Sequence, residues 1–172
     1  MRVTYNRELK VKDLLDALDI ETFIPMQYRI IGVTGGSRER RLVPVIHNLI
    51  FVHSTQQVLT ELKKERGESL PIRYMTRPRI DRGGHEIIRV PEKQMEDFIR
   101  VASAQMDDVL FLEEGDYLSQ IGRRVRITKG YFAGVEGIIK RIKRNRRVVV
   151  SIEGVAAVAT TYIPVDSLIP IE

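Results

Sequence analysis

Apolar residues recur at helical spacing in three segments of the chain. ELKVKDLLDALD (8–19) predicts an amphipathic helix, with Asn6 as its expected cap. Residues 55–66 predict a second helix that ends at Gly67, and a third is expected to begin at Pro91, since proline is accepted in a first helical turn. The apolar positions of the three helices are Leu9, Val11, Leu14, Leu15, Leu18, Val58, Leu59, Leu62, Met95, Phe98, Ile99 and Ala102.

β-Branched and aromatic residues fill the segments between these helices. FIPMQYRII (23–31) and VPVIHNLIFVH (43–53) read as strands, and IRYMT (72–76) and HEIIRV (85–90) as two shorter ones. TGGSRERR (34–41) has paired glycines and charge, which favour a mobile loop or a hairpin tip. We therefore expect an α+β domain, with a three- or four-stranded antiparallel sheet and helices on one of its faces.

The pattern changes after residue 122. VRI, GII, VVVSI and ATTYIPV are short β-branched segments separated by glycine or charged turns, which predicts a small all-β barrel. The expected organisation is a first domain over 1–106, a linker over 107–118 and a second domain over 119–172. Within the linker, VLFL (109–112) is alternatively an additional strand.

Charge separates the same two parts. The 172 residues carry a formal net charge of +5, of which residues 119–172 hold +6 and residues 1–118 hold −1. A basic second domain favours nucleic acid or an acidic protein as a partner, and a merely solubilising surface is the alternative. The absence of cysteine excludes disulfides and thiolate metal sites. No apolar run has the length of a membrane helix and no secretory segment opens the chain, so we expect a cytoplasmic protein without membrane contact.

No catalytic constellation emerges from the residue types that carry enzyme chemistry. His47, His53 and His85 lack metal-ligand spacing with carboxylates. GVTGGS (32–37) is glycine-rich but has no following Lys-Ser/Thr, so it is a poor phosphate cradle. We expect a non-catalytic protein with no cofactor and no metal; an enzyme with an unrecognised site is the alternative.

The most specific motif lies in GRRVRITKGYFAGVEGIIKRI (122–142). Two apolar residues alternate with arginines, as in a half-buried strand, and closely spaced glycines permit positive φ and a sharp bend. An aromatic residue between them can close the end of a barrel. This pattern resembles the KOW motif of NusG-type elongation factors and some ribosomal proteins, and an unrelated small barrel is the alternative. The motif residues are Gly122, Val125, Ile127, Gly130, Phe132, Gly134 and Gly137.

A basic run follows the motif and reads as a hairpin tip between GII and VVVSI. Exposed cations at such a tip suit phosphate contacts, while a solvated tip that blunts strand edges is the alternative. Few aromatic residues accompany the run, which argues against base stacking. The candidate nucleic-acid contacts are Lys140, Arg141, Lys143, Arg144, Arg146 and Arg147.

A KOW module after an α+β domain is the arrangement of the bacterial NusG family, and this chain is similar to it over nearly its whole length. The resemblance implies that the first domain, called NGN, binds RNA polymerase through a partly apolar sheet face. RLVPVIHNLIFVHS (41–54) resembles a strand of that face, so Leu49 and Phe51 are the polymerase-facing candidates, with plain core packing as the alternative; the family often has Tyr where Leu49 stands. In specialised members the start of the first helix approaches non-template DNA. The DNA-contact candidates there and in the following glycine-rich segment are Asn6, Arg7, Lys10, Arg38, Arg40 and Arg41. The last three could meet polymerase instead of DNA, and a disordered solvated loop is the alternative.

The resemblance also implies a function. RVTYNRE, VPEKQMEDFI and VVVSIEGVAAVATTYIP are similar to the NusG paralogues that serve as antiterminators of capsular-polysaccharide operons. A factor of this kind holds the polymerase clamp closed, disfavours pausing and termination, and recruits a ribosomal protein, a termination factor or RNA through its KOW domain. The alternative is a KOW-containing RNA-binding or ribosome-associated protein.

Overall fold

The computed structural model describes residues 1–34, 37–79, 83–104, 106–112 and 122–172. The chain forms two compact units, Met1–Arg89 and Val90–Glu172, called here the first and the second unit. The expected boundaries, with a linker over 107–118, divide the chain at a later point and stay a prediction.

The described part of the first unit contains the helices α1 and α2. Helix α1 (Glu8–Asp16) is shorter than expected, and Arg7 rather than Asn6 is its N-terminal cap residue, without a side-chain cap hydrogen bond. Helix α2 (Gln56–Arg66) begins after Thr55, whose hydroxyl accepts a hydrogen bond from the backbone N–H of Val58 at 3.2 Å. Gly67 ends α2 with φ 50°, a conformation that glycine adopts without strain, and a short 3-10 turn, η1 (Gly67–Ser69), follows.

Within the residues that the structure describes, the strands of the first unit form four separate antiparallel pairs, rather than the expected single sheet of three or four strands. Pro25 contributes to this division, because it lies between two strands and has no N–H with which to continue a ladder. The pairs are β1 (Arg2–Val3) with β6 (Ile72–Arg73), β2 (Glu21–Phe23) with β5 (Phe51–His53), β3 (Met26–Thr34) with β4 (Ser37–Pro44), and β7 (Thr76–Pro78) with β8 (His85–Ile87).

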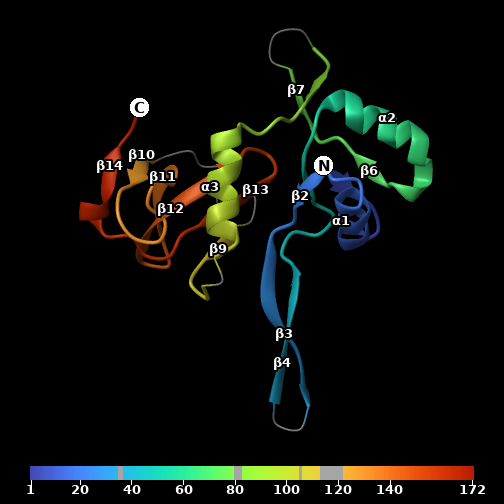
Figure 1. Cartoon of the computed structure of the whole chain (residues 1–172). Helices are drawn as coiled ribbons and strands as arrows, with labels where there is room; N and C mark the ends of the chain where they lie inside the picture. The colour runs from blue at the N-terminus through green and yellow to red at the C-terminus, as the bar shows by residue number, and fades with distance from the viewer. Residues whose placement is uncertain (35–36, 80–82, 105, 113–121) are drawn as a thin grey trace. The chain divides into compact units, whose positions relative to one another are not determined.

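The apolar core of the first unit joins α1 to α2 and to the short strands. Its central residue is Leu15, which is completely buried on the inner face of α1. The β3–β4 hairpin extends away from these helices (Figure 1). The buried members of this core are Val3, Val11, Leu15, Ile24, Ile50, Leu62, Leu70 and Ile72.

The second unit holds one antiparallel sheet of six strands in the order β14-β10-β11-β12-β13-β9. The alternative interpretation of VLFL is confirmed, because β9 pairs with β13. A 3-10 turn, η2 (Val165–Ser167), precedes the last strand. The strands are β9 (Leu110–Leu112), β10 (Arg124–Ile127), β11 (Glu136–Ile142), β12 (Asn145–Ile152), β13 (Ala156–Ala159) and β14 (Leu168–Pro170).

Helix α3 (Glu92–Ala102) packs on this sheet, against β12 and β13 (Figure 1). Phe98 and Val101 lie on its buried face, as the spacing of apolar residues indicates. The sequence analysis assigned this helix to the first domain, whereas its contacts with the sheet belong to the second unit. Periodicity identifies the apolar face of a helix but not the sheet that this face covers.

Candidate polymerase and nucleic-acid interfaces

A sharp turn before α1 projects a tyrosine. Tyr5 and Asn6 both have positive φ, 60° and 52°, which few residues other than glycine adopt. The backbone N–H of Asn6 donates to the side-chain oxygen of Asn48 at 2.8 Å, which holds the turn. The ring of Tyr5 is 82% exposed, and the guanidinium carbon of Arg7 lies 5.5 Å from its centroid. An exposed aromatic ring beside a cation can stack on a base.

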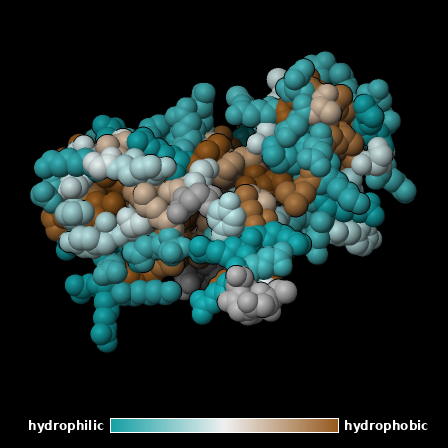
Figure 2. Space-filling model, turned by 60° about the horizontal axis from the view of Figure 1, so that its bottom comes forward, coloured by the Kyte–Doolittle hydropathy of each residue, from teal (hydrophilic) through white to brown (hydrophobic). Residues whose placement is uncertain are grey.

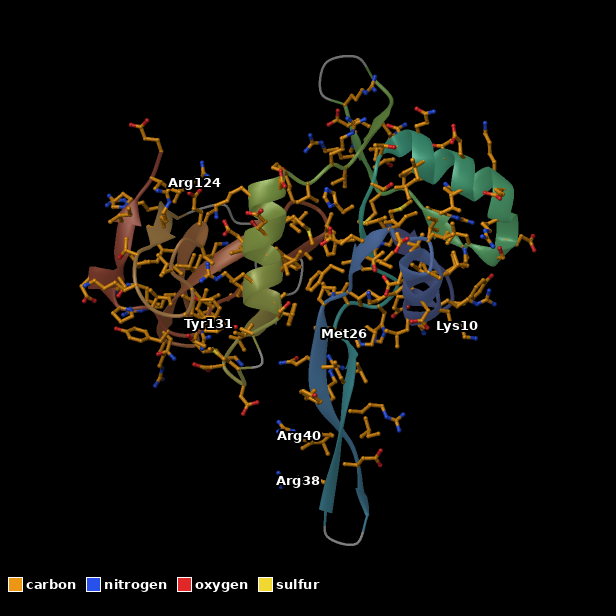
Figure 3. All side chains as sticks on the ribbon, viewed as in Figure 1. Lys10, Met26, Arg38, Arg40, Arg124 and Tyr131 are labelled. Atoms are coloured by element: carbon orange, nitrogen blue, oxygen red, sulfur yellow. The ribbon has the colours of Figure 1, made fainter. Side chains whose placement is uncertain are left out.

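A surface hollow of about 410 Å³ lies beside this turn, between α1 and the segment around η1. Among the described residues that line the hollow, Arg7 and Lys10 are charged and none is a carboxylate, so the hollow suits an anion. Lys10 is labelled in Figure 3. Two of the three predicted DNA contacts at the helix start therefore line one hollow, while Asn6 is exposed on the turn. The sequence analysis missed Tyr5, because nothing in the neighbouring residues signals two successive positive φ angles.

The arginines of the glycine-rich segment lie on a strand rather than in a loop. Arg38, Arg40 and Arg41 belong to β4, which pairs with β3 along its length; residues 35–36 of the expected tip lie outside the described part. Figure 3 shows Arg38 and Arg40 on the same side of the hairpin. Arg41 lies on the other side, directly opposite Arg29 of β3.

The side of the hairpin that carries Arg40 also exposes apolar side chains. Tyr28 and Leu42 are cross-strand partners, and Ile30 is paired with Arg40. Tyr28 and Ile30 are 51% and 52% exposed. An exposed apolar surface with arginine beside it has the composition of a protein-binding site.

The expected polymerase-facing pair is not an exposed patch. Leu49 is completely buried and Phe51 is only 8% exposed, with its ring centroid 6.3 Å from that of Phe23. Leu49 precedes β5 and forms an isolated bridge with Arg2. As the structure stands, neither side chain can contact RNA polymerase, so the assignment of these two residues is corrected.

The glycine motif of the second unit has the local conformations that the sequence indicates. Val125, Ile127 and Phe132 are buried. Gly130 and Gly134 have φ 83° and 92°, in the region that favours glycine. Gly122 and Gly137 are sites of close approach, where any side chain would meet β11 or β12.

Polar side chains of helix α3 form hydrogen bonds with the loop of this motif. The guanidinium of Arg100 donates to the carbonyl oxygens of Ala133 and Tyr131 at 2.8 and 2.9 Å. Lys93 donates to the carbonyl oxygen of Gly134 at 3.1 Å. The buried carboxylate of Asp97 accepts from Lys93 at 2.5 Å and from the backbone N–H of Glu136 at 3.2 Å. These contacts were not predicted, because the helix was expected to pack in the first domain.

The ring of Tyr131 is exposed, although its carbonyl oxygen accepts a hydrogen bond from Arg100. The Tyr131 side chain is 60% exposed and packs edge-to-face on Phe132, with ring centroids 5.1 Å apart (Figure 3). On the face drawn in Figure 2 hydrophilic side chains predominate, and hydrophobic ones gather in smaller areas between them. An exposed tyrosine on a loop whose backbone is hydrogen-bonded to a helix is a suitable anchor for a protein partner.

The basic run forms the predicted hairpin tip between β11 and β12. Lys143 and Arg144 occupy the two-residue turn, both with positive φ, 49° and 66°. Arg141 and Arg146 are directly opposite each other across the strands.

Arg147 differs from the other cations of the run. Its side chain is buried, and it donates to the carbonyl oxygen of Thr160 at 2.7 Å, to that of Asp108, and to the Asp108 carboxylate at 3.1 Å. Arg147 therefore ties β12 to the segment before β9 and is not available to nucleic acid. Its assignment as a contact is corrected.

Metal ligands and membrane-spanning helices are two further features to consider. Among residues 1–34, 37–79, 83–104, 106–112 and 122–172, no group of three or more His, Cys, Asp or Glu side chains could hold a metal ion. Nor does this described part contain a helix long and apolar enough to cross a membrane.

Comparison with known proteins identifies the family. The model of the NusG family, described as "Transcription termination factor nusG", matches residues 1–99, which include the first unit and most of α3. No curated protein matches the chain. Members of this family are non-enzymatic transcription factors that generally bind RNA polymerase. Because the match covers more than half of the sequence, the chain belongs to the NusG family.

Proposed function

We propose that the protein is a transcription elongation and antitermination factor of the cytoplasm. Its first unit binds elongating RNA polymerase and disfavours pausing and termination, and its second unit recruits a further partner. The NusG match over residues 1–99 is the observation that carries this proposal. The glycine motif supports a KOW-type second unit, since its buried and positive-φ residues lie where a compact β-structure needs them.

The exposed apolar side of the β3–β4 hairpin is our candidate for the polymerase contact. Tyr28, Ile30 and Leu42 are exposed there, whereas Leu49 and Phe51 are buried. Aromatic residues and arginine are enriched in the centres of protein interfaces. This surface therefore replaces the strand residues that the family resemblance suggested.

The start of α1 is our candidate for contact with non-template DNA. Arg7 and Lys10 would neutralise phosphates at the anionic hollow, and Tyr5 would stack on a base. Asn6 is exposed beside them and offers an amide for hydrogen bonds.

The second unit offers Tyr131 and the tip of the β11–β12 hairpin to a partner such as a ribosomal protein, a termination factor or RNA. Similarity to capsular-polysaccharide antiterminators suggests that the target genes are long polysaccharide operons. Sequencing nascent transcripts with and without the gene tests this: the distal parts of such operons should lose reads when the gene is deleted.

A pull-down tests the central claim. The immobilised full chain should retain nuclease-treated core RNA polymerase. Leu42→Asp should abolish retention, and Val58→Asp, at an exposed apolar position of α2, is the matched control that should retain it. Failure of the unmodified chain to retain polymerase would refute the proposal, whereas equal retention by both variants would refute only the hairpin contact.

The rival function is an RNA-binding or ribosome-associated KOW protein, which the exposed cations of the β11–β12 tip favour. It predicts strongly salt-dependent binding of the chain to RNA or to ribosomes. The two functions are distinguished by the same pull-down, since only an elongation factor retains polymerase after nuclease treatment.

A further inference from the structure

Charged residues oppose one another across the strands of several antiparallel pairs, and two kinds of pairing occur. Arg77 faces Glu86 across β7–β8, and the two form an ion pair at 2.5 Å. Arg126 faces Glu136 across β10–β11, with an ion pair at 2.6 Å. In both strand pairs the cation is neutralised by its own cross-strand partner.

Two other hairpins place arginine opposite arginine: Arg29 with Arg41 in β3–β4, and Arg141 with Arg146 in β11–β12. Like charges directly opposite each other destabilise a strand pair, because the facing Cα atoms lie only about 5 Å apart. A third such pair, Arg2 with Arg73, lies in a ladder of two residues and not in a hairpin.

Few carboxylates of the described residues neutralise the positive charges of these arginines. In the described ranges, no carboxylate lies within 4.0 Å of the guanidinium groups of Arg29, Arg141 or Arg146. Arg41 approaches only Glu39, at 3.4 Å, and both side chains are largely exposed, so this ion pair contributes little. The strongly basic turn residues Lys143 and Arg144 add to the charge of the second hairpin. Each hairpin is thus a site where an external anion would relieve repulsion.

We propose that the two arginine-paired hairpins bind the phosphate backbone of nucleic acid, one in each unit of the chain. Each of two arginines that face each other across a ladder can donate two parallel hydrogen bonds to a phosphate. Successive phosphates along a strand can occupy such a fork without any reading of the bases.

Phosphate fits these surfaces better than the carboxylates of an acidic protein. The arginine pair of β3–β4 lies on the side of the hairpin opposite Tyr28 and Leu42, and the neighbouring cross-strand pair on its own side is Gln27 with Val43. The arginine pair therefore has no aromatic residue in the adjacent cross-strand pair on its side, whereas aromatic residues are enriched at protein interfaces. At the β11–β12 tip the exposed side chains are cations and Asn145. Surfaces of this composition supply charge and orientation, as backbone contacts do.

The inference rests on the proposed function for its biological setting, but its test contains no polymerase. The full chain is titrated with a fluorescent DNA duplex about two helical turns long, and with a single-stranded RNA, over a range of salt. Arg29→Gln with Arg41→Gln removes one fork, and Arg141→Gln with Arg146→Gln removes the other. With DNA, each double variant should make the slope of log affinity against log salt shallower by about two, and all four changes together by about four.

Lys64→Gln with Arg66→Gln, on the exposed surface of α2, removes the same charge and is the matched control. It should leave the slope nearly unchanged. All variants must have the same far-UV circular dichroism spectrum. If a glutamine variant unfolds, it is replaced by Arg→Lys at the same positions, which keeps the charge but loses the paired donors. The lysine variant should bind more weakly, with an unchanged slope of log affinity against log salt.

The outcomes separate the possibilities. Slopes that change as much in the α2 control as in the hairpin variants overturn the proposal, because net charge alone then explains binding. Equal affinity for polyglutamate also overturns it and indicates an acidic protein. If the hairpin variants lose more affinity for DNA than for RNA, or the reverse, the proposal is supported and the nucleic acid with the larger loss is the one that the hairpins bind. Retention of polymerase by the hairpin variants is measured in the separate pull-down. A negative result in the nucleic-acid titration therefore leaves the proposed function unaffected.

Discussion

The first unit holds its strands as four two-stranded ladders, whereas the second joins six strands in one antiparallel sheet. In the first unit an apolar cluster that includes Leu15 of α1 and Leu62 of α2 joins these helices to the β1–β6 ladder, and Met26 of β3 and Val52 of β5 pack against it. In the second, continuous backbone pairing brings β11 and β12 so close that Gly137 has no room for a side chain.

This difference shows that the two units depend on different interactions. A pair of strands has little independent stability, so the first unit depends on side-chain packing. The second unit has more of its backbone satisfied by ladder hydrogen bonds, and its helix is held partly by polar contacts with the motif loop. Substitutions that act on one kind of interaction should therefore affect one unit more than the other.

The largest expected effect is that of Leu15→Ala. Removing a completely buried leucine from the cluster should lower the free energy of unfolding of the first unit by about 3–4 kcal/mol. Amide hydrogen exchange read by mass spectrometry should show the loss of protection in Met1–Arg89. Leu9→Ala, at an exposed position on the same helix, is the control and should change stability by less than about 0.5 kcal/mol. Equal loss of protection in both units would mean that they unfold together.

Gly137→Ala is the corresponding change in the second unit. A Cβ at this position would approach Cγ1 of Val148 to 2.8 Å and would come still closer to the carbonyl oxygen of Val149. The strands must separate, which should cost about 2–3 kcal/mol and reduce protection in β11 and β12. Gly154→Ala, in a turn with open space around it, is a milder control that tests only the positive φ of 68°. A stability equal to that of the unmodified protein after Gly137→Ala would refute the close packing of these strands.

Asp97→Ala tests the hydrogen bonds between α3 and the motif loop. The change leaves the backbone N–H of Glu136 without its acceptor, while Lys93 can turn to solvent, so we expect a loss of about 1–2 kcal/mol in the second unit. Glu96→Ala, on the exposed side of the same helix, should have little effect. If the two variants are equally stable, the helix is held by its apolar face alone.

The sequence predicted those features that depend on local chemistry. Spacing of apolar residues located all three helices, Gly67 marked the end of α2, and the motif glycines Gly130 and Gly134 have the positive φ that their spacing indicated. The hairpin around Lys143 and Arg144 was also expected, because a charged turn separates two β-branched runs. Each of these signals lies within a few neighbouring residues.

The sequence did not predict features that depend on which distant segments meet. The apolar face of α3 suits either unit, so only the structure assigns it to β12 and β13. The same limit applies to the candidate sites. From their neighbours in the sequence, Phe51 and Arg147 were predicted to be surface contacts, yet residues far away in the chain bury both of them. Tyr5, in contrast, is exposed by a turn that no sequence motif predicts.

Acid should reveal the smallest difference between the units, since each contains a carboxylate with a lowered pKa. The hydrogen bond from Lys12 holds the pKa of Asp16 below its usual value of 3.8, and Thr22 adds to this in the first unit. In the second unit, hydrogen bonds from Arg126 lower the pKa of Glu136 below 4.5.

A carboxyl group with a lowered pKa binds its proton less readily in the folded state than in the unfolded state. Its stabilising contribution is therefore complete above the unfolded pKa and is lost as the pH falls through the folded pKa. Urea unfolding followed by amide NMR signals of each unit, from about pH 6 to pH 3, should show Asp16→Asn flattening the pH dependence of the first unit only. Glu136→Gln should do so in the second unit only. Because both ion pairs lie at the surface, the changes should be small and should decrease with added salt. A pH dependence that either variant alters in both units would show that the units are thermodynamically coupled, in contrast to the separate cores that their packing indicates.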